Sequence, residues 1–112
     1  YQKMHHIAFQ LKDWAHVQRA CDHLYNHQIP LVWGPGRHGA GHNIFTYHRD
    51  PDGQFVELFT ELDIMLNEDL GYFEPRPWHG EFPQKPKVWK DDMNATNHWG
   101  TMPSPEFMFM DA

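Results

Sequence analysis

Histidine is the residue type that points most directly to chemistry in this sequence. The chain holds 10 histidines among 112 residues, beside 15 acidic and 9 basic side chains. Imidazole changes its charge near neutral pH and is the commonest metal ligand in proteins. We therefore expect a metal site or a proton-transfer site, and a carboxylate is the natural second partner for such a metal.

Hydrophobic alternation predicts which histidine and which carboxylate lie on one surface. Residues 4–11 alternate with the period of a half-buried strand, and residues 43–48 and 54–60 are two further predicted strands. If Ile7 and Leu58 face a helix, alternation sends seven residues to the opposite face of the sheet. These are His6, Asn43, Phe45, Tyr47, Phe55, Glu57 and Phe59.

The pair His6 and Glu57 is the candidate metal site. Burying the Glu57 carboxylate would cost several kcal/mol unless the group is neutral, paired or bound to a metal, and a metal would use His6 as well. The alternative is that His6 is a hydrogen-bonded core histidine and Glu57 a carboxylate at the rim, which the pair taken alone favours. His5 is a competing ligand, but its alternation places it against the helix, in a structural role.

His38 and Tyr47 have both a structural and a functional interpretation, and Cys21 has a structural one. Residues 34–39 read Gly-Pro-Gly-Arg-His-Gly and predict a tight loop that projects Arg37 and His38. Either both side chains are then solvated, or His38 lies beside a metal and acts as an acid–base group. Tyr47 is either a core aromatic residue or a hydrogen-bond donor to a ligand. Cys21 lies on an apolar helix stripe and is expected to be a small buried residue.

A helix should pack on the sheet after the first strand. Asp13 is a good N-cap, and Val17, Ala20, Cys21 and Leu24 recur at helical spacing. This pattern predicts an amphipathic helix that ends at about residues 26–28.

Three shorter strands should follow the helix. Residues 31–33 form the first, which the sequence Gly34-Pro35-Gly36 should stop. The last two strands are joined by Asp50-Pro51-Asp52-Gly53, whose proline and glycine positions are typical of a type I turn. The predicted order is βαβββ, an α+β fold.

Composition changes near Asp63. Residues 1–61 contain 3 of the 9 prolines, whereas residues 62–112 contain the other 6 and more acidic than basic side chains. We therefore divide the chain into a βαβββ metal-binding module, residues 1–62, and an extended C-terminal arm, residues 63–112.

The arm has no sustained periodicity. Residues 65–70 are expected to form one or two helical turns. Trp78, Trp89 and Trp99 argue against simple disorder, because disordered segments are usually poor in aromatic residues. We expect an arm that wraps the module through these side chains.

Charge and composition exclude several classes of function. The formal net charge is −6 and basic residues are not concentrated anywhere, which argues against a nucleic-acid partner. The single cysteine cannot form an internal disulfide, which favours a reducing compartment. Apolar runs are far shorter than the roughly 20 residues that span a bilayer, so we expect no membrane association and a cytoplasmic location.

Taken together, the motifs resemble a known family. His5-His6-Ile7-Ala8-Phe9, the segment 34–39, Tyr47 with the turn 50–53, and Val56-Glu57-Leu58 are similar, in this order, to the last βαβββ module of type I extradiol ring-cleaving dioxygenases. Those enzymes belong to the vicinal oxygen chelate superfamily, together with the glyoxalases and the bleomycin-resistance proteins. The resemblance covers residues 4–62.

The resemblance implies a role for four residues and a reaction. His6 and Glu57 match ligands of Fe(II), or less often Mn(II). His38 matches a second-sphere histidine that hydrogen-bonds substrate and oxygen, and Tyr47 matches a tyrosine beside the bound catecholate. The implied partners are a small aromatic diol and dioxygen, and the implied reaction opens the ring next to the diol, as in catechol 2,3-dioxygenases.

One departure from the family pattern leaves alternatives open. The family's first histidine ligand lies in a preceding module, so either the chain is the C-terminal part of a longer dioxygenase or two chains combine their modules. The exposed phenylalanines of the predicted face favour a homodimer or a higher oligomer. Within the superfamily, a glyoxalase-like metal-dependent isomerase or lyase and a ligand-sequestering binding module are the alternatives.

Overall fold

The computed structural model describes residues 4–85 and 96–108. The predicted βαβββ order and α+β class are confirmed, and a small hairpin and a short helix follow. The elements are β1 (His6–Gln10), α1 (Trp14–Asn26), β2 (Trp33–Arg37), β3 (Ile44–Arg49), β4 (Phe55–Thr60), β5 (Met65–Asn67), β6 (Tyr72–Phe73) and α3 (Pro105–Met108).

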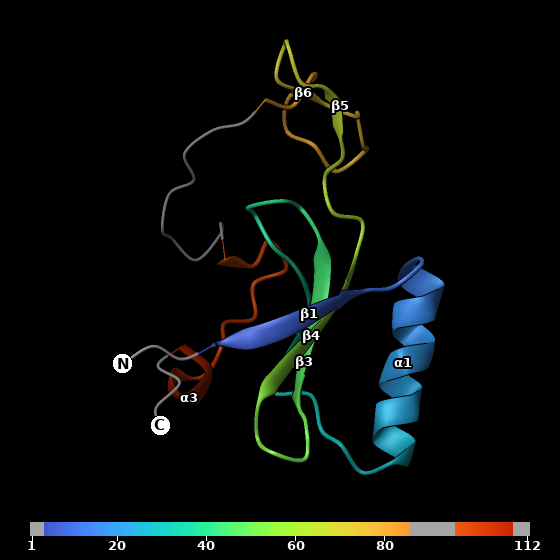
Figure 1. The fold of residues 1–112 in the computed structure, drawn as a ribbon, viewed down its shortest axis with the longest axis vertical. Helices are drawn as coiled ribbons and strands as arrows, with labels where there is room; N and C mark the ends of the chain where they lie inside the picture. Colours follow the sequence, from blue (N-terminus) through green and yellow to red (C-terminus); the bar gives the residue numbers. More distant parts are fainter. Residues whose placement is uncertain (1–3, 86–95, 109–112) are drawn as a thin grey trace.

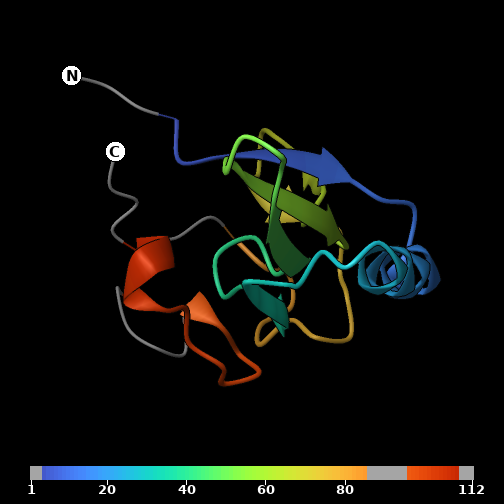
Figure 2. The same cartoon turned by 90° about the horizontal axis from the view of Figure 1, so that it is seen from below.

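The main sheet has four strands in the order β1-β4-β3-β2. Strand β1 pairs with β4 in parallel, and β3 is antiparallel to both of its neighbours. Helix α1 lies on one side of this sheet, and the segment that ends in α3 lies on the other (Figures 1 and 2). The sheet therefore has one face toward α1 and one face partly covered by the arm.

Helix α1 begins and ends where the sequence predicts. The side chain of Asp13 accepts a hydrogen bond from the backbone N–H of His16 at 2.9 Å, which caps the first turn. Val17 and Leu24, one helical face of the predicted stripe, are buried. Their burial fixes the helix against the sheet.

Strand β2 contradicts the prediction that Gly34-Pro35-Gly36 stops a strand. Trp33 pairs with Tyr47 and Gly36 with Phe45, so β2 contains one more residue than β3 between these pairs and forms a bulge. Because β2 is an edge strand, the proline costs no hydrogen bond inside the sheet. Gly34 has a φ of +99°, and a Cβ there would lie 2.7 Å from the carbonyl oxygen of Phe45, so only glycine fits.

The turn between β3 and β4 is confirmed. The N–H of Gly53 donates to the carbonyl oxygen of Asp50 at 2.9 Å. The Asp50 side chain also accepts from the backbone N–H groups of Asp52 and Gln54. This tight turn sets the register in which Tyr47 lies opposite Glu57.

The arm supplies part of the aromatic core. Phe107 of α3 joins Trp33, Phe45, Tyr47 and Phe55 in one buried cluster on the face away from α1. Phe45 and Phe55 are 0% and 1% exposed, so neither needs a second chain for cover. The chain itself therefore buries these two rings, whose expected exposure was one reason to predict an oligomer. The oligomer itself stays a prediction.

The start of the arm is a hairpin instead of the predicted helical turns at residues 65–70. Strands β5 and β6 form a two-stranded sheet, and Asn67 accepts a hydrogen bond from the N–H of Leu70 in the turn between them. Gly71 follows with a φ of +69°, a conformation that ends a helix and suits a turn.

The tryptophans of the arm contact the module as expected where they are described. The Arg37 guanidinium lies 4.3 Å from the ring centroid of Trp78, and Trp99 packs edge-to-face on Trp14. Trp89 lies outside the described residues. In the described part of the chain, no helix has the length and apolarity needed to cross a membrane.

The bulge in β2 generates a stability prediction. Gly53 also has a positive φ, +83°, but open space around it, so Gly53→Ala isolates the backbone cost of about 1–2 kcal/mol. Gly34→Ala adds a clash with the β3 backbone and should lower the free energy of unfolding by about 3 kcal/mol or more. Urea unfolding of both variants measures the difference, and equal losses would contradict the tight fit.

Candidate active site

The Glu57 carboxylate is the centre of a polar cluster on the face away from α1. Its side chain is 8% exposed. Glu57 Oε1 lies 3.1 Å from His6 Nε2, and Glu57 Oε2 lies 3.5 Å from His38 Nε2. Asn43 Nδ2 donates to Oε2 at 3.3 Å. The structure thus brings the four predicted site residues together, since Tyr47 also contacts this group, and Asn43 joins them.

Strand pairing explains why these residues meet. Tyr47 of β3 lies directly opposite Glu57 of β4. His6 of β1 lies opposite Phe55, two positions from Glu57 and therefore on the same face of the sheet. His38 follows the last residue of β2 and stacks on Phe45, with ring centroids 3.9 Å apart.

The arm fixes the orientation of His38. His38 Nδ1 lies 2.8 Å from the carbonyl oxygen of Thr96. A carbonyl only accepts hydrogen bonds, so Nδ1 carries the proton that it donates. The other nitrogen, Nε2, faces the site and lies 3.1 Å from the hydroxyl oxygen of Tyr47.

The prediction that His5 faces the helix is wrong. Its ring packs on Phe55 and Phe107, on the same side of the sheet as the site. Alternation fails here because β1 begins only at His6, so His5 is not constrained by the pleat of the strand. His5 is nevertheless a structural residue, as expected, because it hydrogen-bonds His6 and the arm.

The His5–His6 pair determines which atom His6 offers to Glu57. His5 Nε2 donates to the carbonyl oxygen of Phe107 at 2.7 Å, and His5 Nδ1 lies 2.8 Å from His6 Nδ1. When both rings are uncharged, His5 Nδ1 must accept and His6 Nδ1 must donate. The lone pair of His6 Nε2 then points to Glu57.

Two acceptor atoms facing each other require a cation or a proton. His6 Nε2 and Glu57 Oε1 are 3.1 Å apart, which suits two neighbouring ligands of one divalent ion, whose bonds to such atoms are about 2.1 Å long. The hydrogen bond from His6 to His5 is the outer-shell support typical of metal-bound histidine. The residues present therefore fit two ligands of a metal centre.

Tyr47 is held in its protonated form. Burial, then the negative charge of Glu57, and then a hydrogen bond with Glu57 raise the pKa of Tyr47 well above its ordinary value. The phenol keeps its proton at neutral pH and acts as a hydrogen-bond donor in the site.

Arg37 does not project into solvent, contrary to the loop prediction. Its side chain donates to the carbonyl oxygen of His42 at 2.6 Å and to Glu61 at 2.9 Å. Its backbone N–H donates to Asn97 of the arm at 3.1 Å. The arm covers this edge of the sheet, so the segment after the bulge is interior and carries His38 toward Glu57.

Comparison with known proteins identifies the family. Residues 1–58 match the family model described as Glyoxalase/Bleomycin resistance protein/Dioxygenase superfamily. The chain belongs to this superfamily. The resemblance found in the sequence is confirmed, and so is the α+β module that it implied.

Individual relatives within the superfamily are dioxygenases. The chain is 34% identical over 89 residues to a manganese-dependent 2,3-dihydroxybiphenyl 1,2-dioxygenase of Geobacillus genomosp. 3, with 78% of this chain and 27% of the relative covered. It is 39% identical over 61 residues to metapyrocatechase of Pseudomonas sp. (strain CF600), covering 54% and 20%.

A solved dioxygenase structure is also similar to the chain. The homoprotocatechuate 2,3-dioxygenase of Arthrobacter globiformis superimposes with a TM-score of 0.69 at 26% identity, over 95% of this chain and 30% of that chain. The chain therefore spans less than a third of the length of each of these three relatives.

A second cluster of polar side chains, around Asp63, was not predicted from the sequence. His42 Nδ1 lies 2.8 Å from Asp63 Oδ2, and His79 Nε2 lies 2.7 Å from Asp63 Oδ1. All three residues lie outside the strands, where alternation gives no information about neighbours. The only available signal was residue type, namely two histidines and an aspartate.

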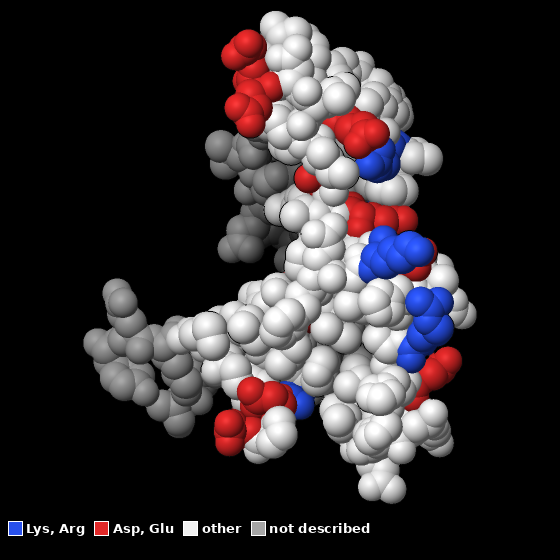
Figure 3. Space-filling view, turned by 45° about the vertical axis from the view of Figure 1, so that its right-hand side comes forward, with Lys and Arg blue, Asp and Glu red and all other residues white. Residues whose placement is uncertain are grey.

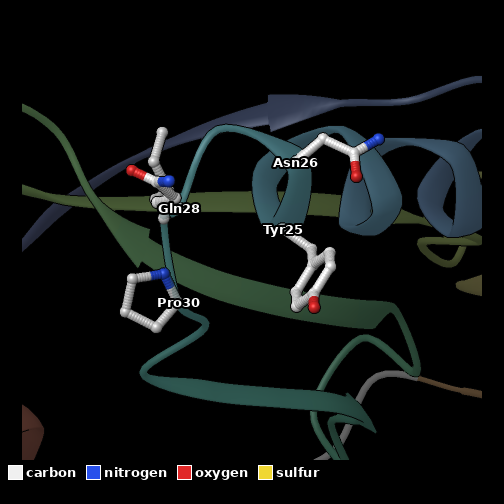
Figure 4. A pocket seen from close by; sticks show the side chains of 5 residues that line it. Tyr25, Asn26, Gln28 and Pro30 are labelled. Carbon is white, nitrogen blue, oxygen red and sulfur yellow. The ribbon is translucent and has the colours of Figure 1, made fainter.

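A hollow between α1 and the sheet is lined by three histidines, His16, His23 and His48, but by no carboxylate. An open hollow at the end of α1 is lined by Tyr25, Asn26, Gln28, Ile29 and Pro30 (Figure 4) and offers neither a histidine nor a carboxylate. On the face shown in Figure 3, Lys and Arg side chains lie among Asp and Glu side chains.

The raised pKa of Tyr47 predicts how stability depends on alkaline pH. Because the folded state keeps the phenol proton that the unfolded state loses above about pH 10, stability falls as pH rises past that value, by up to about 1.4 kcal/mol per pH unit. Tyr47→Phe should remove this contribution and flatten the decline, whereas Tyr25→Phe, at an 81% exposed position, should not. Denaturant unfolding between about pH 9 and 11 measures both slopes, and an unchanged slope in Tyr47→Phe would refute the assignment.

Proposed function

We propose that the chain is the metal-binding C-terminal module of an extradiol dioxygenase that cleaves a catecholic ring. The observation that carries this proposal is the approach of His6 Nε2 to Glu57 Oε1 at 3.1 Å, with His38 and Tyr47 directly beside them. The dioxygenase relatives, whose names include a dihydroxybiphenyl and a homoprotocatechuate enzyme, support it. In this proposal residues 1–62 form the module and residues 63–112 the arm.

His6 and Glu57 would hold the metal, Fe(II) or less often Mn(II), and a third ligand would come from a preceding module or from a second chain. The named manganese dependence of one relative keeps both metals in the proposal. When bound, such an ion would provide open positions for both oxygens of an aromatic diol and for dioxygen. A homodimer or higher oligomer in the cytoplasm remains part of the proposal.

His38 is proposed as the residue that moves a proton. Its Nδ1 proton is committed to the carbonyl oxygen of Thr96, so proton exchange is restricted to Nε2, the nitrogen that faces the site. An imidazole nitrogen there can accept a proton from a diol hydroxyl near neutral pH and return it later. The arm thereby selects the working nitrogen.

Tyr47 would act with His38 as a hydrogen-bond donor that can turn between two acceptors. Its single proton can be donated to His38 Nε2 or to Glu57, since its hydroxyl contacts both. When His38 Nε2 gains a proton, it can donate to the Tyr47 oxygen and Tyr47 can turn its own proton to Glu57. The pair therefore accommodates both protonation states of His38 without a buried unpaired atom.

A glyoxalase-like isomerase or lyase, or a binding module, would not require this arrangement of His38. Neither alternative gives a reason for the arm to fix the histidine tautomer. The named relatives are ring-cleaving dioxygenases as well. We therefore favour the dioxygenase.

Glu57→Gln tests the metal ligand. The amide keeps the volume but loses the charge that neutralises a divalent ion, so the complete protein should lose about one equivalent of bound iron or manganese and its affinity should fall by orders of magnitude. Glu68→Gln, at an exposed position, is the matched control and should keep the metal content of the parent. Elemental analysis after gel filtration gives the result, and full retention by Glu57→Gln would exclude this ligand.

His38→Phe tests the proton carrier. The metal should stay bound, because His38 is not a proposed ligand, while ring cleavage of a catechol should slow by about 10²-fold or more. His23→Gln, which changes an exposed histidine of α1, should leave the rate unchanged. Turnover and metal content are measured on the same samples, and an unaltered rate in His38→Phe would remove this residue from the mechanism.

A further inference from the structure

The second cluster joins three separate parts of the chain. His42 comes from the loop before β3, Asp63 from the segment after β4, and His79 from the arm after β6. One ligand atom from each residue, two imidazole nitrogens and a carboxylate oxygen, lies within 4.8 Å of the others. Neither His6 nor Glu57 belongs to this group.

The cluster is buried, and the two nearest arginines are bound to other carboxylates. The side chains of His42, Asp63 and His79 are 4%, 6% and 0% exposed. Arg76 is close enough to interact electrostatically with Asp63, but its guanidinium is bound to Glu74, and Arg37 is bound to Glu61. Buried carboxylates usually require full pairing or a metal ion.

The ring of His79 and the backbone at residues 41–42 both contact Asp63. His79 Nδ1 is buried and has no hydrogen-bond partner among the described residues, so the contact of Nε2 with Asp63 is its polar anchor. His42 has a φ of +58°, which costs a non-glycine residue about 1–2 kcal/mol. The preceding Gly41 accepts a hydrogen bond from the N–H of Asp63 at 2.9 Å.

We propose that His42, Asp63 and His79 bind a second divalent metal ion, Zn²⁺, which fastens the arm to the βαβββ module. Two imidazoles and one carboxylate are a donor set typical of zinc, with a fourth position for water or another ligand. The ring nitrogens that now face Asp63 would bind the ion through their lone pairs, so each ring would carry its N–H hydrogen on the opposite nitrogen.

His98 is a candidate for the fourth position. Its ring centroid lies 5.8 Å from that of His42. This site does not depend on the proposed dioxygenase activity.

The test uses the complete protein carrying Glu57→Gln, so that the His6–Glu57 site does not contribute. After metal removal, exposure to Zn²⁺ and gel filtration, this protein should retain about one equivalent of zinc. Addition of Asp63→Asn or His79→Gln should weaken zinc binding by more than about 100-fold, since even loss of an outer-shell partner costs about 10–100-fold. Adding His23→Gln removes one of two neighbouring histidines at the end of α1, where zinc could bind adventitiously, and should change nothing.

A second measurement guards against misfolding of the variants. Long-range nitrogen NMR of ¹⁵N-histidine-labelled Glu57→Gln protein should show shifts of His42 Nδ1 and His79 Nε2 on addition of Zn²⁺, with the fold unaltered. No retained zinc and no shifts, or equal retention with and without Asp63→Asn, would overturn the second site. Unchanged iron content in Glu57→Gln would overturn the dioxygenase assignment and leave the zinc result intact.

Discussion

A carboxylate buried on an aromatic sheet face is the constraint on which the rest of the structure depends. Glu57 shares this face with Phe45, Phe55 and Tyr47, and its side chain is only 8% exposed, so water solvates it poorly. Such a group is stable only if hydrogen-bond donors or cations surround it. The pairing of β4 with both β1 and β3 satisfies this requirement, because it brings side chains from both neighbouring strands to one carboxylate. Closure of this face by Phe107 then makes those contacts stronger by excluding solvent.

The arm does more than cover the face, because its backbone sets the protonation pattern of the site. The carbonyl oxygen of Thr96 accepts from His38, and that of Phe107 accepts from His5, which in turn orders His6. In both cases a group that can only accept fixes which ring nitrogen carries a proton. The nitrogen that faces Glu57 is thereby chosen from outside the sheet. Phe107 lies in the short helix α3, and the last carbonyl groups of a helix have no partner within it, so this one can accept from His5.

The predictability of the site from the sequence follows from the geometry of strands. Alternation placed His6, Tyr47 and Glu57 on one face because all three lie within strands, where the side-chain period is fixed. His5 lies one residue before β1 and escaped that rule. The Gly34-Pro35-Gly36 sequence was wrongly assigned as a strand end, because glycine and proline disfavour central strands but are tolerated in a bulge at a sheet edge.

Side-chain alternation does not apply to loop residues, as the neighbours His42 and Asn43 show. These neighbours lead to different clusters: Asn43 donates to Glu57, and His42 contacts Asp63. Asp63 itself follows the strand that carries Glu57, so the two clusters share the same pair of chain segments. Because His79 brings the arm to Asp63 while Thr96 brings it to His38, the arm is attached to this pair of segments at two points. Two described parts of the arm, one before residue 86 and one after residue 95, therefore contribute to the two clusters separately.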